Sequence, residues 1–172
     1  MIEKNNIQKI EEYFFTYPLK VTYLRELSRE LNLSMPTIVA SVDKLTKEGL
    51  ITTTRGKAIT IVKANTTCLL FRQLKRAHNL EQLYSSGLVD FIQKRGNEPL
   101  AIVCFGSYSR GDDTEQSDVD IAVVGGSQKE IDVASFEKTL KRKISVHMVD
   151  LKRISKEFYN NLCNGIVLEG AL

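Results

Sequence analysis

Residues 105–121 read Phe-Gly-Ser-Tyr-Ser-Arg-Gly-Asp-Asp-Thr-Glu-Gln-Ser-Asp-Val-Asp-Ile. The run from Ala101 to Phe105 just before the glycine is apolar and rich in β-branched and aromatic residues, which predicts a strand buried on both faces. Gly106 allows backbone N–H groups to approach an anion closely, and Ser107 adds a hydroxyl donor. Arg110 offers charge-assisted bonds to phosphate oxygens. The turn after this strand is therefore a candidate phosphate site.

The end of the same segment carries two carboxylates two residues apart. In a strand, the alternation of side chains puts Asp118 and Asp120 on one face and Val119 and Ile121 on the other. Carboxylates this close repel each other unless a cation lies between them, and hard oxygen ligands suit Mg²⁺ that also holds substrate phosphates. A phosphate site facing such a pair predicts nucleotidyl or phosphoryl transfer.

Together these features resemble a known family signature. Gly106-Ser107, then ten residues, then Asp-x-Asp is similar to the motif of the nucleotidyltransferase superfamily with the DNA polymerase β fold, especially its minimal nucleotidyltransferase branch. The resemblance runs over about residues 98–172. It implies that Gly106 and Ser107 hold the triphosphate of an NTP and that Asp118 and Asp120 ligate Mg²⁺.

A third strand is predicted over residues 144–150, and here the sequence departs from the family. By resemblance, active relatives carry on this strand a third carboxylate that ligates metal or acts as base, and His147 holds the position. Ser145 shares its face, whereas alternation puts Asp150 on the opposite face. Three interpretations of His147 stay open: a structural residue in a weakened site, a general base or a ligand that prefers Mn²⁺ or Zn²⁺, or a shifted register.

Other reactive side chains are expected to be structural. Asp112, Asp113 and Glu115 are predicted to form a solvated acidic loop, and His78 to lie on the surface or at a helix cap. Three widely spaced cysteines lack a paired motif and are expected to be buried thiols in a reducing compartment. They are Cys68, Cys104 and Cys163.

Residues 1–65 are predicted to form a winged helix-turn-helix domain that binds DNA. Helical periodicity, an N-cap at Ser34 and a stop at Gly49 predict three helices, and a basic turn predicts a hairpin after them. The predicted ranges are 5–16, 22–31 and 34–49 for the helices and 51–54 and 58–62 for the strands. The order of elements resembles winged-helix transcription regulators.

The third of these helices offers a candidate DNA-reading face. Its residues Thr37, Ala40, Ser41 and Lys44 lie roughly 100° from the apolar stripe, since a helix turns by about 100° per residue. In a DNA-binding winged helix this face enters the major groove, while Arg55 and Lys57 at the hairpin tip contact phosphate or the minor groove. The alternative is a module for protein docking or dimerisation.

Helices are also expected in the rest of the chain. A helical connector over residues 66–97 contains a long amphipathic helix and a short helix that ends at Gly96 and packs beneath the first strand. The apolar stripe expected for the long helix comprises Leu69, Leu70, Leu74, Ala77 and Leu80 or Leu83. After the acidic strand, helices and a terminal strand are expected over 131–142 and 158–172.

The charge of the 172-residue chain is unevenly distributed. The net value of +3 combines 10 basic against 7 acidic residues in 1–65, 5 against 2 in 66–97, and 9 against 12 in 98–172. This split is compatible with nucleic acid at the front and metal-bound nucleotide at the back. The absence of an early apolar run predicts a cytoplasmic protein with no membrane partner.

These observations predict an α+β protein in which a winged helix-turn-helix domain, a helical connector and a nucleotidyltransferase domain follow one another. Its expected activity is Mg²⁺-dependent transfer of NMP from an NTP to a hydroxyl, coupled to binding of duplex DNA. By analogy with antitoxin relatives, the acceptor is a partner protein such as a cognate toxin, and a homodimer is a further expectation. The alternative is a transcription regulator whose weakened transferase domain senses nucleotide without chemistry.

Overall fold

The computed structural model describes residues 5–57, 59–126 and 130–172. Predictions that fall on residues 1–4 and on Ala58 lie outside the described residues. The chain divides into two compact units between Lys75 and Arg76. Each unit contains its own sheet and its own core.

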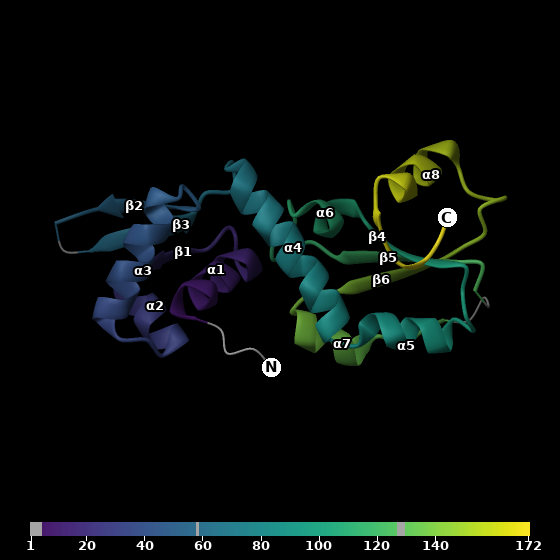
Figure 1. Ribbon diagram of the computed structural model, residues 1–172, viewed down its shortest axis with the longest axis horizontal. Helices are drawn as coiled ribbons and strands as arrows, with labels where there is room; N and C mark the ends of the chain where they lie inside the picture. Colours follow the sequence, from purple (N-terminus) through teal and green to yellow (C-terminus); the bar gives the residue numbers. More distant parts are fainter. Residues whose placement is uncertain (1–4, 58, 127–129) are drawn as a thin grey trace. The chain divides into compact units, whose positions relative to one another are not determined.

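The first unit combines three helices with a three-stranded antiparallel sheet (Figure 1). Its elements are α1 (Asn6–Thr16), β1 (Val21–Tyr23), α2 (Leu24–Leu31), α3 (Met35–Lys47), β2 (Ile51–Arg55) and β3 (Thr60–Ala64). The strand order is β1-β3-β2, and β2 and β3 confirm the predicted hairpin. The predicted helix start at Thr22 is wrong, because this fully buried β-branched residue lies in β1 and pairs with Val62.

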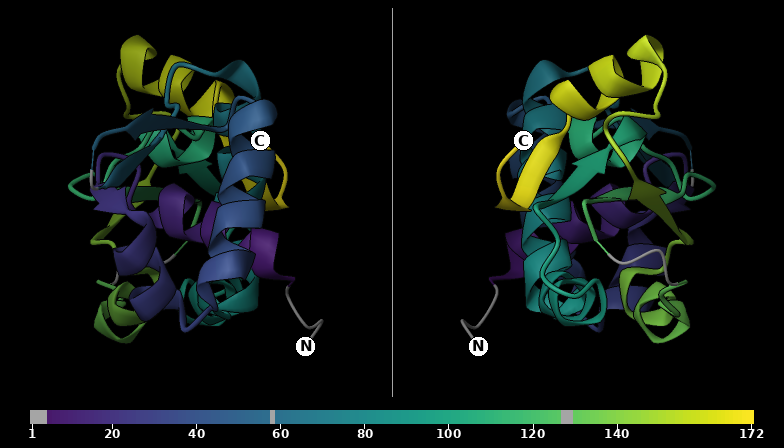
Figure 2. Two further views of the ribbon diagram at one scale, coloured as in Figure 1. Left: turned by 90° about the vertical axis from the view of Figure 1, so that its left-hand side faces the viewer. Right: turned by 90° about the vertical axis from the view of Figure 1, so that its right-hand side faces the viewer.

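Capping side chains set the starts of two helices in this unit. Asn5 and Gln8 form a reciprocal capping box at the start of α1. Ser34 accepts a hydrogen bond from the backbone N–H of Thr37 and caps α3, as the sequence predicted. The left view of Figure 2 shows α3 in front of α1. Apolar residues of the three helices and of both hairpin strands build the core beneath them.

Helix α4 (Leu69–Ser85) belongs to both units, since the division between them falls within it. Its Phe71 is part of the first core and its Leu83 part of the second. The predicted apolar stripe is wrong at Leu69, Leu70, Leu74 and Ala77, which are exposed, and it is confirmed only toward the end of the helix, where Leu80 is half-buried and Leu83 is buried. The buried positions follow one another at intervals of four residues, and the two middle ones are polar. They are Phe71, Lys75, Asn79 and Leu83.

The second unit is built on a mixed four-stranded sheet in the order β6-β5-β4-β7. Strands β4 and β5 and strands β4 and β7 are antiparallel, whereas β5 and β6 are parallel. The right view of Figure 2 shows β7 at one edge of the sheet, with α8 beside it. The elements after α4 are α5 (Leu88–Arg95), β4 (Ala101–Phe105), α6 (Gly106–Arg110), β5 (Val119–Val124), α7 (Ala134–Leu140), β6 (Ile144–Val149), α8 (Lys156–Cys163) and β7 (Ile166–Gly170).

The two faces of this sheet are covered differently. One face packs against α5 and α7 through side chains that include Cys104 and Ile121. The other face packs against α8 through side chains that include Val103 and Ala122. Both coverings confirm the α+β class and the small mixed sheet. Helix α7 is shorter at both ends than the predicted range 131–142.

The cysteines do not share one environment. Cys104 is buried, Cys68 is half-buried and Cys163 is exposed, so the expectation of three buried thiols is wrong for Cys163.

In the described part of the chain, no helix is long and apolar enough to cross a membrane.

Candidate active site

The candidate site lies on the sheet face that α8 partly covers, where β5 begins. Asp118 is exposed immediately before β5, and Asp120 is half-buried near the start of that strand. In the register of the sheet Asp120 pairs with Phe105 of β4 and with Ser145 of β6, and Ala122 pairs with His147. Ser145 and His147 therefore lie on the same face as Asp120.

The side chains of Ser145 and His147 on β6 each contact one of the two carboxylates. The hydroxyl of Ser145 donates to Oδ2 of Asp118 at 3.3 Å, and Nε2 of His147 lies 3.5 Å from Oδ1 of Asp120. That contact is too long and poorly aligned for a hydrogen bond, so the buried Nε2 has no hydrogen-bond partner among the described residues. The structure thus brings His147 to the carboxylates, in the register that the sequence suggested.

Gly106 brings the backbone of the turn against the carboxylate of Asp120. Its φ is +73°, and a Cβ at this position would lie 2.6 Å from Oδ2 of Asp120, so only glycine fits without displacement. The turn itself is the short helix α6, and no described side chain caps its start. Ser107 is half-buried at that start. Gly106, Ser107 and Asp120 therefore form one local structure.

Arg110 occupies the other end of α6 and contacts the loop after it. Its side chain is exposed, and its Nε donates to Asp112 at 3.1 Å. The structure shows no contact between Arg110 and Asp118 or Asp120 among the described residues. A role for Arg110 with phosphate therefore stays a prediction.

An aromatic cluster borders the site beside His147. The rings of Phe105 and Phe158 lie 5.4 Å from each other, and the His147 ring lies 5.4 Å from Phe105 and 6.1 Å from Phe158. Because Phe158 comes from α8, this helix closes one side of the carboxylate face. The cluster orients the imidazole and shields part of it from water.

The donor set fits Mg²⁺ that arrives with a nucleotide. Asp118 and Asp120 supply hard oxygen ligands, and the close approach at Gly106 leaves no room for another side chain there. Over residues 5–57, 59–126 and 130–172, no three His, Cys, Asp or Glu side chains gather as a ready set of metal ligands. Mg²⁺ usually takes one or two carboxylates and completes its shell with phosphate oxygens and water, which matches this arrangement.

The loop between the two motifs differs at one residue from its prediction as a solvated acidic segment, since Asp112 is exposed and Glu115 half-buried but Asp113 is buried. Asp113 is only 2% exposed and forms an ion pair with the buried Arg142 at 3.5 Å. Asn79 of α4 also donates to Asp113, at 2.7 Å. Sequence reasoning missed these three residues, because a polar side chain carries no periodic signal of burial.

Burial changes the acid–base behaviour of two neighbours of the site. Burial raises the pKa of Cys104 to about 12, and the charges of Asp120 and Asp113 add to the effect. Burial likewise raises the pKa of Tyr108, again with a contribution from Asp113. Both groups are therefore neutral at physiological pH and supply no nucleophile.

The predicted DNA-reading residues occupy different environments in the first unit. Lys44, Arg55 and Lys57 are exposed, and Thr37 is half-buried with its hydroxyl 2.8 Å from that of Ser34. Ser41 is a correction, because it is only 6% exposed and lies on the buried face. A small polar residue can complete a buried stripe, and Ser41 does so between the apolar positions of α3 that the sequence identified.

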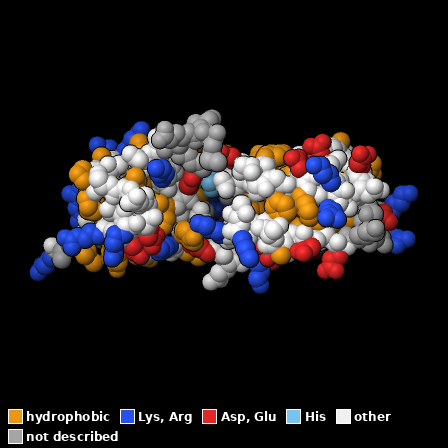
Figure 3. All heavy atoms as spheres, turned by 90° about the horizontal axis from the view of Figure 1, so that it is seen from below, with side chains coloured by type: hydrophobic (Ala, Val, Ile, Leu, Met, Phe, Trp, Pro, Cys, Tyr) orange, Lys and Arg blue, Asp and Glu red, His pale blue; other side chains and the backbone are white. Residues whose placement is uncertain are grey.

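The charges on this surface are mixed. Lys44 lies 3.9 Å from Glu48, and Arg55 lies 4.0 Å from Asp43. Figure 3 shows Lys and Arg side chains interspersed with neutral and hydrophobic ones on the face that it draws. The exposed positions of α3 that follow the helical period are Pro36, Val39, Ala40, Asp43, Lys44 and Lys47.

Comparison with known families identifies the second unit. Residues 87–172, half of the chain, match the family model described as Polymerase beta, Nucleotidyltransferase. The chain belongs to this family. No curated protein matches the chain in sequence. The family match confirms the resemblance to nucleotidyltransferases that the Gly-Ser and Asp-x-Asp motifs indicated. The matched region begins earlier than that resemblance and includes α5. A nucleotidyltransferase domain implies an NTP substrate.

Proposed function

We propose that the protein transfers an NMP group from a Mg²⁺-bound NTP to a hydroxyl acceptor. The observation that carries this proposal is the close contact of Gly106 with Asp120, which would put a triphosphate held at this turn next to a carboxylate that could ligate its metal. Asp118 and Asp120 would hold the metal, and the turn at Gly106 and Ser107 would hold the phosphates. The metal would neutralise charge on the phosphates and on the leaving pyrophosphate.

The environment of His147 supports a role as general base for the acceptor hydroxyl. Its Nε2 is buried, lacks a hydrogen-bond partner among the described residues and lies next to Asp120. A neutral imidazole beside a carboxylate can accept the proton of an incoming hydroxyl, and the resulting imidazolium gains an ion pair with Asp120. Such a base would serve where active relatives are expected to carry a third carboxylate.

The first unit supports a second part of the proposal, binding of duplex DNA by a winged helix. Its three helices come before a hairpin, as the sequence predicted for such a domain, and Lys44, Arg55 and Lys57 are exposed. Binding of DNA would place the transferase near its own gene or partner. A cognate toxin as acceptor and a homodimer in solution belong to the same proposal and rest on analogy.

Nucleotide binding tests the site before any acceptor is known. Calorimetric titration with Mg²⁺ and each α,β-methylene NTP is expected to show binding to the wild type and none to the Asp118→Asn/Asp120→Asn variant. Unchanged affinity in the variant would refute the assignment. Binding that changes DNA affinity without any transfer would instead favour the alternative function, a nucleotide-sensing transcription regulator.

A further inference from the structure

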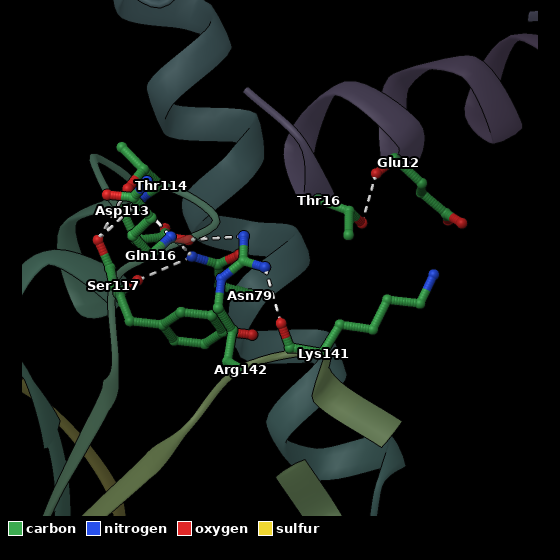
Figure 4. Close-up of polar contacts among 10 residues, drawn as sticks. Glu12, Thr16, Asn79, Asp113, Thr114, Gln116, Ser117, Lys141 and Arg142 are labelled. Atoms are coloured by element: carbon green, nitrogen blue, oxygen red, sulfur yellow. Dashed lines mark hydrogen bonds and ion pairs between the residues drawn. The ribbon is translucent and has the colours of Figure 1, made fainter. Parts of the chain in front are cut away.

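A buried carboxylate fixes the loop of residues 111–118. This loop joins the turn at Gly106 and Ser107, called the phosphate turn below, to β5, called the carboxylate strand. The side chain of Asp113 is fully buried, and that of Arg142 is 4% exposed. Asn79 Nδ2 donates to Oδ1 of Asp113 at 2.7 Å, and Arg142 Nη2 donates to Oδ2 at 3.5 Å. Figure 4 shows Asn79 and Arg142 converging on Asp113, the first from α4 and the second from the segment that precedes β6.

The network is joined to the backbone on both sides of the site, by the Asn79 side chain on one side and by the main chain next to Arg142 on the other. Asn79 Nδ2 also donates to the carbonyl of Tyr108 in α6 at 2.9 Å. Arg142 precedes Lys143, whose carbonyl accepts a hydrogen bond from the N–H of Val119 at 2.8 Å. Asn79, Asp113 and Arg142 therefore connect the phosphate turn to the first residue of the carboxylate strand.

A tight turn transmits this anchoring to Asp118. The backbone N–H of Thr114 donates to Oγ of Ser117 at 3.0 Å, and the N–H of Ser117 donates to the carbonyl of Thr114 at 3.1 Å (Figure 4). Asp118 follows directly and is exposed, with a long 3.3 Å hydrogen bond from Ser145. The position of its carboxylate thus depends mainly on the turn before it and the strand after it.

Stability alone is a weak reason for such a network. A buried ion pair often stabilises a fold no better than apolar residues of the same volume, although removal of one partner is strongly destabilising. What a buried, hydrogen-bonded pair does supply is a fixed geometry between the segments that it joins. Here those segments are the phosphate turn and the strand of the carboxylate pair.

We propose that Asn79, Asp113 and Arg142 are positioning residues that hold the Asp118 carboxylate at the distance from the Gly106 turn that a metal-bound triphosphate requires. This inference rests on the proposed function, since it concerns the same site. None of the three side chains needs to contact substrate. Their loss should therefore weaken metal binding in the nucleotide complex before it affects any chemical group in the reaction.

The Asn79→Ala variant tests this, because it removes the link to Tyr108 but leaves the buried ion pair intact. Its matched control is Asn65→Ala, which removes an amide hydrogen bond to the carbonyl of Gly49 in the first unit. Each variant is titrated with Mn²⁺ in the presence of an α,β-methylene NTP, and the signal of free Mn²⁺ in electron paramagnetic resonance gives the affinity. The temperature is one at which circular dichroism shows that each variant is folded. Asn79→Ala should weaken Mn²⁺ binding about 10-fold, as loss of groups that orient metal ligands does. Asn65→Ala should bind Mn²⁺ like the wild type.

The outcomes separate this inference from the proposed function. Normal Mn²⁺ binding by folded Asn79→Ala, beside a wild type that binds, would overturn the positioning role and leave the proposed function standing. A wild type that binds no Mn²⁺ with any nucleotide would overturn both. Asp113→Asn should have a larger effect; if it does not fold, the result for Asn79→Ala decides. Recovery of transfer by Asn79→Ala at high Mn²⁺ would further support positioning over a general loss of structure.

Discussion

Gly106 and Asp120 lie in such close contact that a Cβ on the glycine would be 2.6 Å from Oδ2 of the aspartate. The glycine follows one strand and the aspartate lies near the start of the next, and Phe105 beside the glycine pairs with Asp120 in the sheet. The backbone that would hold phosphate and the carboxylate that would hold metal are thereby fixed relative to each other. Any side chain at position 106 must displace one of them.

Gly106→Ala is therefore expected to lose nucleotide binding in addition to stability. A left-handed backbone costs a non-glycine residue roughly 1–2 kcal/mol. Gly87→Ala is the matched control, because Gly87 has a φ of +77° and no atom within 4 Å of an added Cβ. Thermal unfolding should show similar losses for both variants, whereas calorimetry should show loss of Mg²⁺–NTP binding for Gly106→Ala alone. Equal nucleotide affinities of the two variants would contradict this site geometry.

His147→Gln should lower the rate of transfer with nucleotide affinity nearly unchanged. The amide cannot accept the proton of the acceptor, and removal of a general base typically costs about 100-fold or more in rate. Single-turnover measurements would separate the rate from the affinity. His147→Asp, which provides a carboxylate at this position, should recover part of the rate with Mg²⁺. A His147→Gln variant that transfers at the wild-type rate would make His147 a structural residue.

On α3 and at the hairpin tip, loss of basic side chains should weaken binding to DNA, and loss of an acidic side chain should strengthen it. Lys44→Ala with Arg55→Ala is expected to weaken binding to duplex DNA and to lower the slope of log K against log salt by about 0.9 for each phosphate that the protein no longer neutralises. Asp43→Asn should strengthen binding, because it removes a negative charge 4.0 Å from Arg55. Fluorescence anisotropy over a salt series measures both effects. Identical slopes for all variants would argue against this face.

The raised pKa of Cys104 predicts a loss of stability at alkaline pH. The thiol has a pKa of about 12 in the folded protein against 9.0 as its ordinary value, so the unfolded chain loses its proton first as pH rises. The contribution of Cys104 to the free energy of unfolding is fully present below pH 9. It is lost between pH 9 and 12, by about 1.4 kcal/mol per pH unit. Urea unfolding over this range should show a shallower decline for Cys104→Ala. If the stability of the wild type and of Cys104→Ala declined in parallel, the raised pKa of Cys104 would be refuted.

Thiol labelling provides an independent check on the same environments. In the native protein, the exposed Cys163 should react with iodoacetamide at a mildly alkaline pH, while Cys104 should stay protected until the second unit unfolds. Rapid modification of Cys104 in the folded protein would contradict its burial in strand β4.

The sequence predicted the strand–turn–strand geometry of the candidate site because the signals for that geometry are local. Gly106, Ser107, Asp118 and Asp120 lie within one strand–turn–strand segment, where glycine and alternating side chains have direct conformational meaning. The parallel pairing that brings His147 beside Asp120 is not local. The strand over residues 144–150 followed from its apolar pattern, and the position of His147 from the family resemblance, but only the structure shows that this strand is parallel to β5.

Several of the errors arose where polar residues are buried. Ser41 completes the inner face of α3, and Asn79 lies on the inner face of α4. Patterns based on apolar residues assign both to the surface. Asp113 looks like one of several loop acids, and only its tertiary partners Asn79 and Arg142 distinguish it. Partners distant in sequence leave no periodic signal, so the structure was needed to find them.

The most direct measurement is transfer of label from α-labelled NTPs by the purified protein with Mg²⁺ or Mn²⁺, alone and with cell extract. The wild type should release pyrophosphate and label an acceptor, and the Asp118→Asn/Asp120→Asn variant should do neither. The labelled species would then identify the acceptor class. No transfer with any nucleotide and either metal, from a wild type that binds Mg²⁺–NTP, would contradict the enzymatic function.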